Sequence, residues 1–442
     1  MQKPLITLLA GVLIAMNIVF FPLGTVSTIF VIIGFGVVYV AVRNAGFDET
    51  TVDFLISVFI VALVLRLALA SLIYGMDLQG SFGPDAFTYD SWGNELARKW
   101  DGLPTDYSTD FNRVGWGMPY IVGVFYYVIG RNPLAIQVIS CVLGAASALL
   151  TYVLSDEIIG NKRVAKYSAV IVAVFPAMII WTSQLLKEGF IIFALLLSLL
   201  AAWNLKKRIT PQWLIMLVGA LLMLFMLRSY IFGMVVIAIV SGFVIAPSKT
   251  NSALIGRFIA CMIIAFGFSF AGVWQLSEDQ FQKLGDLDQI QQAREYASES
   301  ANSGIDNSTD IRSTGGIITA LPLGFVTLLF APFPWQVSSM TQALTMPEMV
   351  VWWLSLPFLV AGLLFAIRHR LRRSMTVLVF VAILTLAYSL TQGNLGTIYR
   401  QRAQIQIFLL QFVAVGLVLQ LEKRENAKLV KKYKRKSLGL RA

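Results

Sequence analysis

Histidine and cysteine are almost missing from this 442-residue chain, which has one histidine and two cysteines. The single imidazole, His369, excludes a multi-histidine metal site and any catalytic scheme that needs two imidazoles. Both cysteines, Cys141 and Cys261, fall inside apolar runs, so neither a disulfide framework nor a cysteine metal cluster is indicated. Charged residues are also scarce, at 13% of the chain against 57% hydrophobic residues, and this excludes an ordinary soluble domain.

Long apolar runs dominate the sequence instead. A helix that crosses a bilayer needs roughly twenty apolar residues, and we interpret twelve runs as crossings: residues 5–23, 25–42, 52–74, 133–154, 164–182, 187–204, 211–227, 229–246, 255–273, 347–367, 374–391 and 403–421. Two further runs, 114–130 and 315–331, are shorter and contain internal glycine or proline. No cleavage-site pattern follows the first run, so we interpret it as a membrane helix and not as a signal peptide.

The distribution of basic residues predicts the orientation. Lysine and arginine gather at 156–166, 206–208, 368–373 and 423–441, and the positive-inside rule places these segments and both termini in the cytoplasm. The segments 114–130 and 315–331 then have no room to cross, so we expect them to be interfacial or re-entrant. The net charge of +11 lies at the bilayer edges and does not indicate nucleic acid. We therefore expect one transmembrane domain over 1–421, outer loops at 75–132 and 274–346, and a basic cytoplasmic tail over 422–442.

The stretch 81–100 in the first outer loop predicts a short helix at the membrane surface. Pro84 and Asp85 suit a helix start, because proline fits the first position and a carboxylate complements the helix dipole. Apolar residues then recur with helical spacing as far as Trp100. Tyr89 follows Asp85 by about one turn and so shares its face, whereas Asp90 is rotated away. The alternative is that Asp85 is only an N-terminal helix acid.

Several charges lie against the positive-inside trend, at the predicted outer edge or within a crossing. They are Arg66, Lys187, Glu188, Arg228, Arg400 and Arg402. Such residues are functional candidates because an arginine at the bilayer centre costs about 2.5–3.5 kcal/mol. Arginine grips phosphate bidentately, so a lipid phosphate or diphosphate is the natural ligand. Structural alternatives remain open: Arg66 as a strut or a partner of Glu188, Lys187 and Glu188 as a self-paired turn, and Arg400 and Arg402 as headgroup anchors.

In this arrangement the chain resembles the GT-C superfamily of integral-membrane glycosyltransferases. The features that carry the resemblance are an outer Asp-x-x-x-Tyr motif (Asp85, Tyr89), a dipping segment at 116–130, an outer turn at 183–188 that ends in Glu188, Pro-Phe-Pro-Trp at 332–335, and Gly-Asn-Leu-Gly-Thr at 393–397 before Arg400. Protein mannosyltransferases, the lipid A aminoarabinose transferase and, most closely, bacterial exopolysaccharide-cluster transferases are the similar groups. Many members have Asp-Glu at the first motif, where this chain has Asp85 and Ala86.

The resemblance implies an all-α polytopic membrane protein with a GT-C-like bundle, located in a bacterial inner membrane, with its active site on the outer face. It implies a polyprenyl-phosphate sugar donor, a glycan, lipid or protein acceptor, and Asp85 as general base. Tyr89, Asp90, Lys187, Glu188, Arg66, Arg228, Arg400 and Arg402 would then bind substrate. No cofactor is certain, and dependence on a divalent metal stays open.

Two other functions fit the same outer cations. An O-antigen-type polymerase or ligase would use the arginines on a lipid-diphosphate glycan and would need Asp85 less. A transporter or flippase of lipid-linked sugar would show paired broken helices in corresponding halves, but the two short runs do not occupy matching contexts.

Overall fold

The computed structural model describes residues 24–105, 117–245, 286–299, 310–337, 340–391 and 393–437, together with the single residues 11, 18 and 21. Every regular element in these ranges is a helix. In chain order they are α2 (Gly24–Asn44), α3 (Glu49–Gly75), α4 (Gln79–Phe82), α5 (Asp85–Trp100), α6 (Gly117–Ile129), α7 (Pro133–Ile159), α8 (Lys162–Val174), α9 (Pro176–Thr182), α10 (Glu188–Lys207), α11 (Pro211–Leu227), α12 (Ser229–Ile245), α15 (Leu287–Glu299), α16 (Thr314–Phe330), the 3₁₀ turn η1 (Pro334–Gln336), α17 (Met340–His369), α18 (Leu371–Thr391) and α19 (Leu395–Ser437).

Seven of these helices are long and apolar enough to cross a membrane: α2, α3, α7, α10, α17, α18 and α19. The bent pair α8 and α9, with 54° between its halves, would make an eighth span. Four shorter apolar helices, α6, α11, α12 and α16, accompany them. The prediction of an all-α multi-pass membrane protein is therefore confirmed at this level. The predicted crossings over 5–23 and 255–273 lie outside the described residues, apart from residues 11, 18 and 21.

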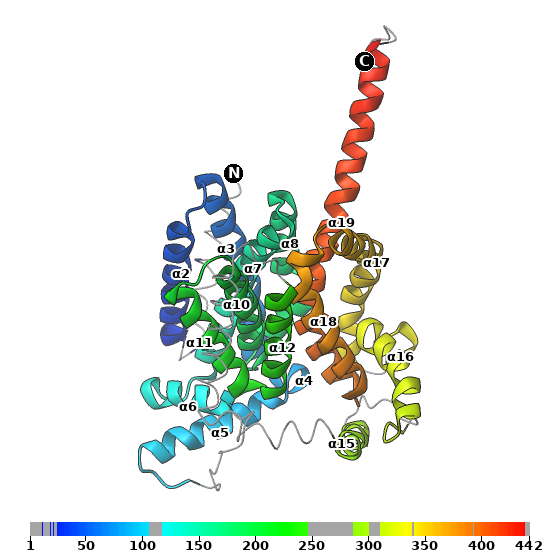
Figure 1. The fold of residues 1–442 in the computed structure, drawn as a ribbon. Coiled ribbons are helices and arrows are strands. Elements are labelled where there is room, and N and C mark those ends of the chain that lie inside the picture. Colours follow the sequence, from blue (N-terminus) through cyan, green and yellow to red (C-terminus); the bar gives the residue numbers. More distant parts are fainter. Residues whose placement is uncertain are drawn as a thin grey trace.

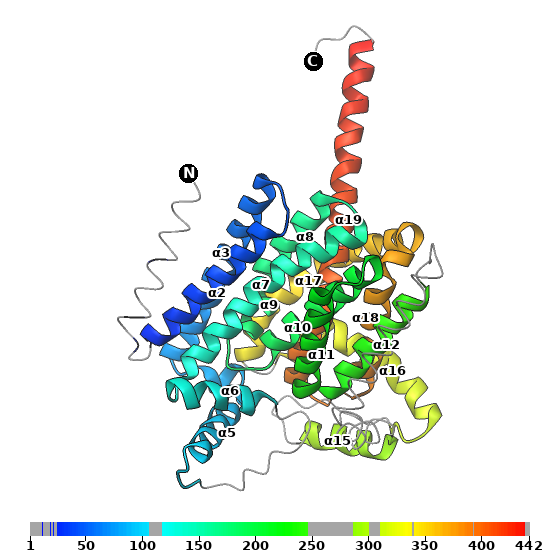
Figure 2. The same ribbon diagram turned by 60° about the vertical axis from the view of Figure 1, so that its left-hand side comes forward.

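The long helices run roughly side by side, and α7 and α10 lie inside the bundle (Figures 1 and 2). In the most apolar part of each of these two helices, 78% of the residues are buried within the protein, against 22% for α2 at the edge. Helix α7 contacts α2, α3, α8 and α10, while α19 packs along α17 and α8. The apolar side chains of α2 and α17 that protein does not cover face outwards, as expected for helices in contact with lipid.

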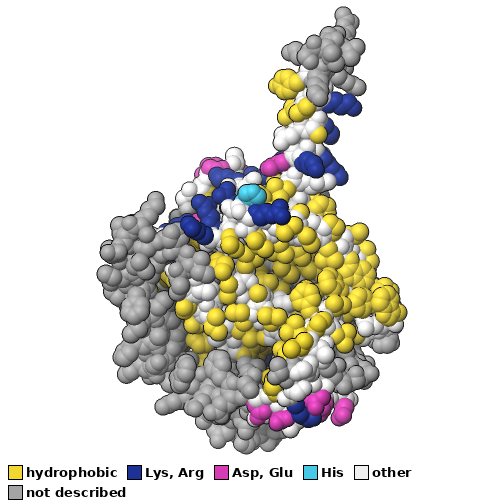
Figure 3. All heavy atoms as spheres, turned by 45° about the vertical axis from the view of Figure 1, so that its right-hand side comes forward, with side chains coloured by type: hydrophobic (Ala, Val, Ile, Leu, Met, Phe, Trp, Pro, Cys, Tyr) yellow, Lys and Arg dark blue, Asp and Glu magenta, His cyan; other side chains and the backbone are white. Residues whose placement is uncertain are grey.

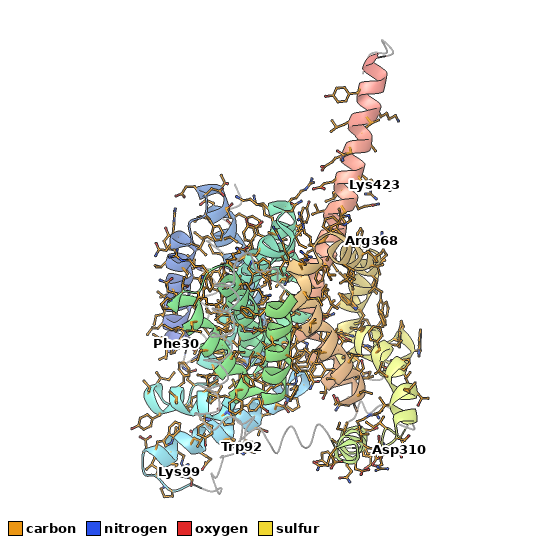
Figure 4. All side chains as sticks on the ribbon, in the orientation of Figure 1. Phe30, Trp92, Lys99, Asp310, Arg368 and Lys423 are labelled. Atoms are coloured by element: carbon orange, nitrogen blue, oxygen red, sulfur yellow. The ribbon has the colours of Figure 1, made fainter. Side chains whose placement is uncertain are left out.

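The two ends of the bundle differ in charge. Figure 3 shows a broad apolar belt with mostly lysine, arginine and the single histidine at its upper edge, and mostly carboxylates, with some basic side chains among them, near its lower edge. Arg368 and Lys423 mark the basic end in Figure 4, whereas Trp92, Lys99 and Asp310 lie at the opposite end. Helices α4, α5, α6 and α15 all gather at this second end (Figure 1).

Helix α5 starts and packs as its sequence predicts. It begins at Asp85 with Pro84 as the preceding cap residue. The predicted apolar face, from Ala86 through Tyr89 to Ala97, is buried, while Trp100 is 40% exposed. The buried face packs on α6, which has 13 residues. A helix of that length spans about 20 Å, well short of the ~30 Å hydrocarbon core.

The run 164–182 is interrupted where a single straight crossing is expected. Helix α8 ends at Val174, Phe175 is extended, and α9 begins at Pro176. Proline has no N–H to continue the helical hydrogen bonds, so the last carbonyl groups of α8 need other partners. The turn between α9 and α10, which carries Lys187, follows this break.

Candidate functional site

Glu188 lies at the centre of a cluster of charged side chains at the end of the bundle opposite the basic one. It is the first residue of α10, and its side chain is fully buried. Its Oε1 atom accepts a hydrogen bond from Nη2 of Arg228 at 3.0 Å and lies 3.2 Å from Nε of Arg400. Nη1 of Arg400 in turn donates to Oδ2 of Asp85 at 2.5 Å. One continuous ionic chain thus joins Asp85, Arg400, Glu188 and Arg228.

Four separate parts of the chain supply these residues. Asp85 and Glu188 each begin a helix, where a carboxylate complements the positive end of the dipole. Arg228 is the residue between α11 and α12, and Arg400 lies in the second turn of α19. Because all four positions are at or near helix ends on one side of the bundle, the helix packing brings together residues up to 315 positions apart.

Lys187 and Tyr89 complete the cluster. The Lys187 ammonium lies 5.5 Å from the centroid of the Tyr89 ring, within cation–π range. Burial and the nearby charge of Arg228 lower the pKa of Lys187 to about 8, although Glu188 and Asp85 oppose this shift. Burial also raises the pKa of Tyr89 well above its usual value, so the phenol stays protonated near neutral pH.

Asp85 is ionised and partly accessible. Partial burial alone would raise its pKa, but the charge and hydrogen bond of Arg400 outweigh this effect and leave the pKa below its usual value. The Asp85 side chain is 43% exposed, whereas that of Arg400 is 16% exposed. The carboxylate therefore forms the solvent-facing edge of the cluster and the arginines its buried wall.

The cluster carries more positive than negative charge. Three cations, Lys187, Arg228 and Arg400, face only the two carboxylates of Asp85 and Glu188. Nε of Arg228 and Oε2 of Glu188 are buried and have no hydrogen-bond partner among the described residues. Buried polar groups normally have partners, so Nε of Arg228 is an unused donor, whereas Oε2 of Glu188 is an acceptor that needs a water or another donor. An excess of cations with an unused donor is the chemistry of an anion site.

Behind the ionic chain lies a row of hydrogen-bonded polar side chains that sequence reasoning missed. Nη1 of Arg228 donates to the Tyr230 hydroxyl at 2.7 Å, and the Tyr230 and Tyr388 hydroxyls are 3.4 Å apart. The Tyr388 hydroxyl donates to Oε1 of Gln404 at 2.8 Å. Gln404 lies one turn after Arg400 on α19. A glutamine inside an apolar run was the available signal, because polar residues are costly there.

Three glutamines hold the start of α5 against the turn that carries Lys187 and Glu188. Nε2 of Gln79 donates to Oε1 of Gln184 at 3.2 Å, and Nε2 of Gln137 donates to Oε1 of Gln79 at 2.8 Å. Gly83 permits this close approach, since a Cβ atom there would lie 2.6 Å from Oε1 of Gln184. Asp85 follows Gly83 by two residues, so this network fixes where its carboxylate lies.

Asp90, Arg66 and Arg402 lie outside the cluster. Asp90 accepts a hydrogen bond from the Tyr126 hydroxyl at 2.7 Å and pairs with Arg131 at 2.5 Å, and this links α5 to α6 and the residues that follow it. The fully buried Arg66 donates to Oγ1 of Thr182 at 2.8 Å and to the carbonyl groups of Ala62 and Ala173 at 2.9 and 3.0 Å.

The contacts of Arg66 match the strut alternative and not a pair with Glu188. The partners of Glu188 are Arg228 and Arg400. The Ala173 carbonyl belongs to the last turn of α8, beside the helix break, where it has no partner within its own helix. Arg66 therefore stabilises the break between α8 and α9.

Arg402 faces away from Arg400. Two residues along a helix correspond to a rotation of about 200°, and Arg402 is accordingly buried on the other side of α19, where it donates to the Ala331 carbonyl. Its guanidinium lies 5.0 Å from the Tyr399 ring centroid, and the Tyr399 hydroxyl donates to Glu348. Sequence reasoning missed Glu348, a buried acid at the start of an apolar run.

Within the described parts of the chain, no group of three or more His, Cys, Asp or Glu residues is arranged to hold a metal ion. The two acids of the cluster are both paired with arginine. The chain matches no protein-family model and no curated protein, so the functional assignment depends on the geometry of this cluster.

Proposed function

We propose that this protein is an integral-membrane glycosyltransferase of the GT-C type, which transfers a sugar from a polyprenyl-phosphate donor to an acceptor at the outer face of the membrane. The basic end of the bundle faces the cytoplasm, because lysine and arginine are retained on that side. The end that carries α5, α6 and the charged cluster then faces outwards. The two crossings expected at 5–23 and 255–273, together with α11 and α12, complete a bundle of twelve. Helices α6 and α16 are its interfacial or re-entrant segments.

The observation that carries the proposal is an accessible carboxylate beside a buried set of cations. Arg400 contacts Asp85 directly, and Arg228 and Lys187 lie next to Glu188 in the same cluster. A glycosyl phosphate has the complementary parts: a phosphate for the cations, and a sugar whose anomeric carbon lies next to that phosphate. The carboxylate is then close to the place where an acceptor hydroxyl must approach.

The reaction uses both parts of the cluster. The phosphate of the donor competes with Asp85 for Arg400, so donor binding releases the carboxylate from its ion pair. The acceptor oxygen attacks the anomeric carbon while its proton passes to Asp85. The bond between that carbon and the phosphate oxygen breaks, and polyprenyl phosphate leaves with the electron pair. Arg400, Arg228 and Lys187 stabilise the charge that develops on the leaving phosphate.

Asp85 gains basicity when it leaves Arg400. In the ion pair its pKa is below the usual value, which makes it a weak proton acceptor. Loss of the neighbouring cation raises a carboxylate pKa, and general-base catalysis is most effective when the pKa approaches the working pH. Donor binding and activation of the base are therefore coupled through one guanidinium.

The excess of cations in the cluster also fits a second function, that of an O-antigen-type polymerase or ligase. A lipid diphosphate carries more negative charge than a phosphodiester and would engage all three cations. In that reaction Asp85 could stay paired with Arg400 without loss of rate. The contribution of Asp85 to turnover therefore distinguishes the two enzymes.

The function is tested with purified protein in lipid nanodiscs, incubated with polyprenyl-phosphate sugars and candidate acceptors. The proposal expects a glycosylated product and an equal amount of released polyprenyl phosphate. Product formed only from lipid-diphosphate glycans would assign the polymerase or ligase function. Movement of intact lipid-linked sugar across a sealed vesicle, with no product, would make the protein a transporter.

A further inference from the structure

The last helix, α19, continues far beyond the apolar belt. It extends without interruption from Leu395 to Ser437, and its end projects past all the other helices at the basic end of the bundle (Figures 1 and 2). Arg163 of α8 pairs with both carboxylate oxygens of Glu425, at 2.8 and 2.7 Å. This bidentate pair lies where the projecting part leaves the bundle.

The projecting segment, residues 423–437, is strongly basic and bears an apolar patch. It contains eight lysines and arginines and one glutamate. Leu429, Val430 and Tyr433 are 52%, 55% and 71% exposed. Their spacing places them on one side of the helix. Lys428 and Lys431 of the same segment are exposed. Large apolar side chains in water on a basic segment indicate a surface that another molecule covers.

We propose that segment 423–437 binds a soluble acidic protein, which receives the helix in an apolar groove with a carboxylate rim. A helix that offers a short apolar face inside a basic surface is the usual ligand of such a groove. The groove covers Leu429, Val430 and Tyr433, and the rim pairs with the lysines and arginines around them. The partner then covers the apolar patch and neutralises the basic residues of the segment.

Two other occupants fit less well. A second copy of this chain would bring the same positive charge against the segment, so the two helices would repel each other. An anionic bilayer could attract the charge, but the helix would have to lie flat. Residues 417–437 contain neither glycine nor proline to form a bend, and α19 is continuous through them.

Calcium-loaded calmodulin serves as the probe, since it is an acidic protein whose apolar groove opens only with calcium. The full chain in nanodiscs of neutral lipid is titrated with labelled calmodulin, and saturable binding is expected. The triple variant Leu429→Ser, Val430→Ser, Tyr433→Ser keeps every charge and should bind about tenfold or more weakly, because its apolar contacts are lost. Removal of calcium should weaken binding of the parent protein in the same way. Unchanged thermal unfolding of the triple variant verifies that it is folded.

Three outcomes would overturn the proposal. Equal binding by the parent and the triple variant would show that charge alone attracts the probe. Quenching of a fluorophore at Tyr433→Cys by headgroup-level quenchers in anionic nanodiscs would show that the segment lies on the bilayer. A stable dimer that dissociates on the triple substitution would make a second copy the occupant.

Discussion

Replacement of Glu188 by glutamine removes the charge that holds two arginines together. Glu188 is fully buried, and its Oε1 atom lies 3.0 Å from Arg228 and 3.2 Å from Arg400. The variant keeps the size of the side chain but leaves Arg228, Arg400 and Lys187 opposed by Asp85 alone. Breaking a buried ion pair by removal of one partner costs about 3–5 kcal/mol. We therefore expect a large loss of stability.

A double-mutant cycle separates the coupling energy of the Glu188–Arg228 pair from non-specific destabilisation. Arg228→Met removes the other charge, and the double variant Glu188→Gln, Arg228→Met leaves Arg400 paired with Asp85. Glu188→Gln leaves Arg228 without an opposite charge, and Arg228→Met leaves Glu188 with Arg400 as its one cation. The double variant removes both charges of the pair, so it should be less destabilised than the sum of the two single variants, by about 0.5–3 kcal/mol.

Thermal unfolding of the four proteins in the same nanodiscs measures the cycle. Glu425→Gln is the matched control, because it breaks an ion pair with Arg163 in which both side chains are largely accessible, and exposed pairs contribute little. Additive effects in the cycle, or a Glu188→Gln protein as stable as the parent, would refute the account of a strongly coupled ionic chain.

Three further predictions concern the anion site and the orientation. The affinity for a polyprenyl-phosphate sugar should fall as the pH rises through about 8, because Lys187 loses its proton there and the phosphodiester does not titrate. The Lys187→Arg variant should remove this pH dependence. A flat pH profile in the parent protein would exclude Lys187 from the site. Arg400→Ala should weaken donor binding by about 1.5–3 kcal/mol, the contribution of a charge-assisted contact, with only partial recovery in Arg400→Lys. Unchanged affinity would limit Arg400 to its ion pairs with Asp85 and Glu188. A cysteine at Ser298 should react with an impermeant reagent added to intact cells, and protection from it would reverse the proposed topology.

The local elements were predictable from sequence where one strong signal decided them. Apolar run length gave the long helices, and proline followed by an acid gave the start of α5 at Asp85. Hydropathy alone failed at residues 164–182, because the run is apolar on both sides of Pro176 and hydropathy does not register the 54° bend there. The proline itself was the unused signal.

The partners in the cluster were less predictable than its members. Arg400, Glu188 and Arg228 were each identifiable from their charge at the predicted outer edge. No local sequence signal, however, predicts that Arg400 pairs with Asp85, 315 residues away. That pairing is set by how α5, α10 and α19 pack. Arg402 could have been separated from Arg400 by helical rotation alone. The contacts of Arg66 with backbone carbonyl groups could not have been predicted, since they depend on the break between α8 and α9.

Transfer by the Asp85→Asn protein, compared with Asp90→Asn, tests the central claim most directly. Both variants replace a carboxylate of α5 with an amide, but Asp90 pairs with Arg131 outside the cluster. If Asp85 is the general base, its variant should lose roughly a hundred- to ten-thousand-fold in rate. Donor affinity should persist or rise, because Arg400 no longer has a competing carboxylate, and Asp90→Asn should be much milder. Near-normal transfer by Asp85→Asn, with the donor still bound, would contradict the proposed mechanism.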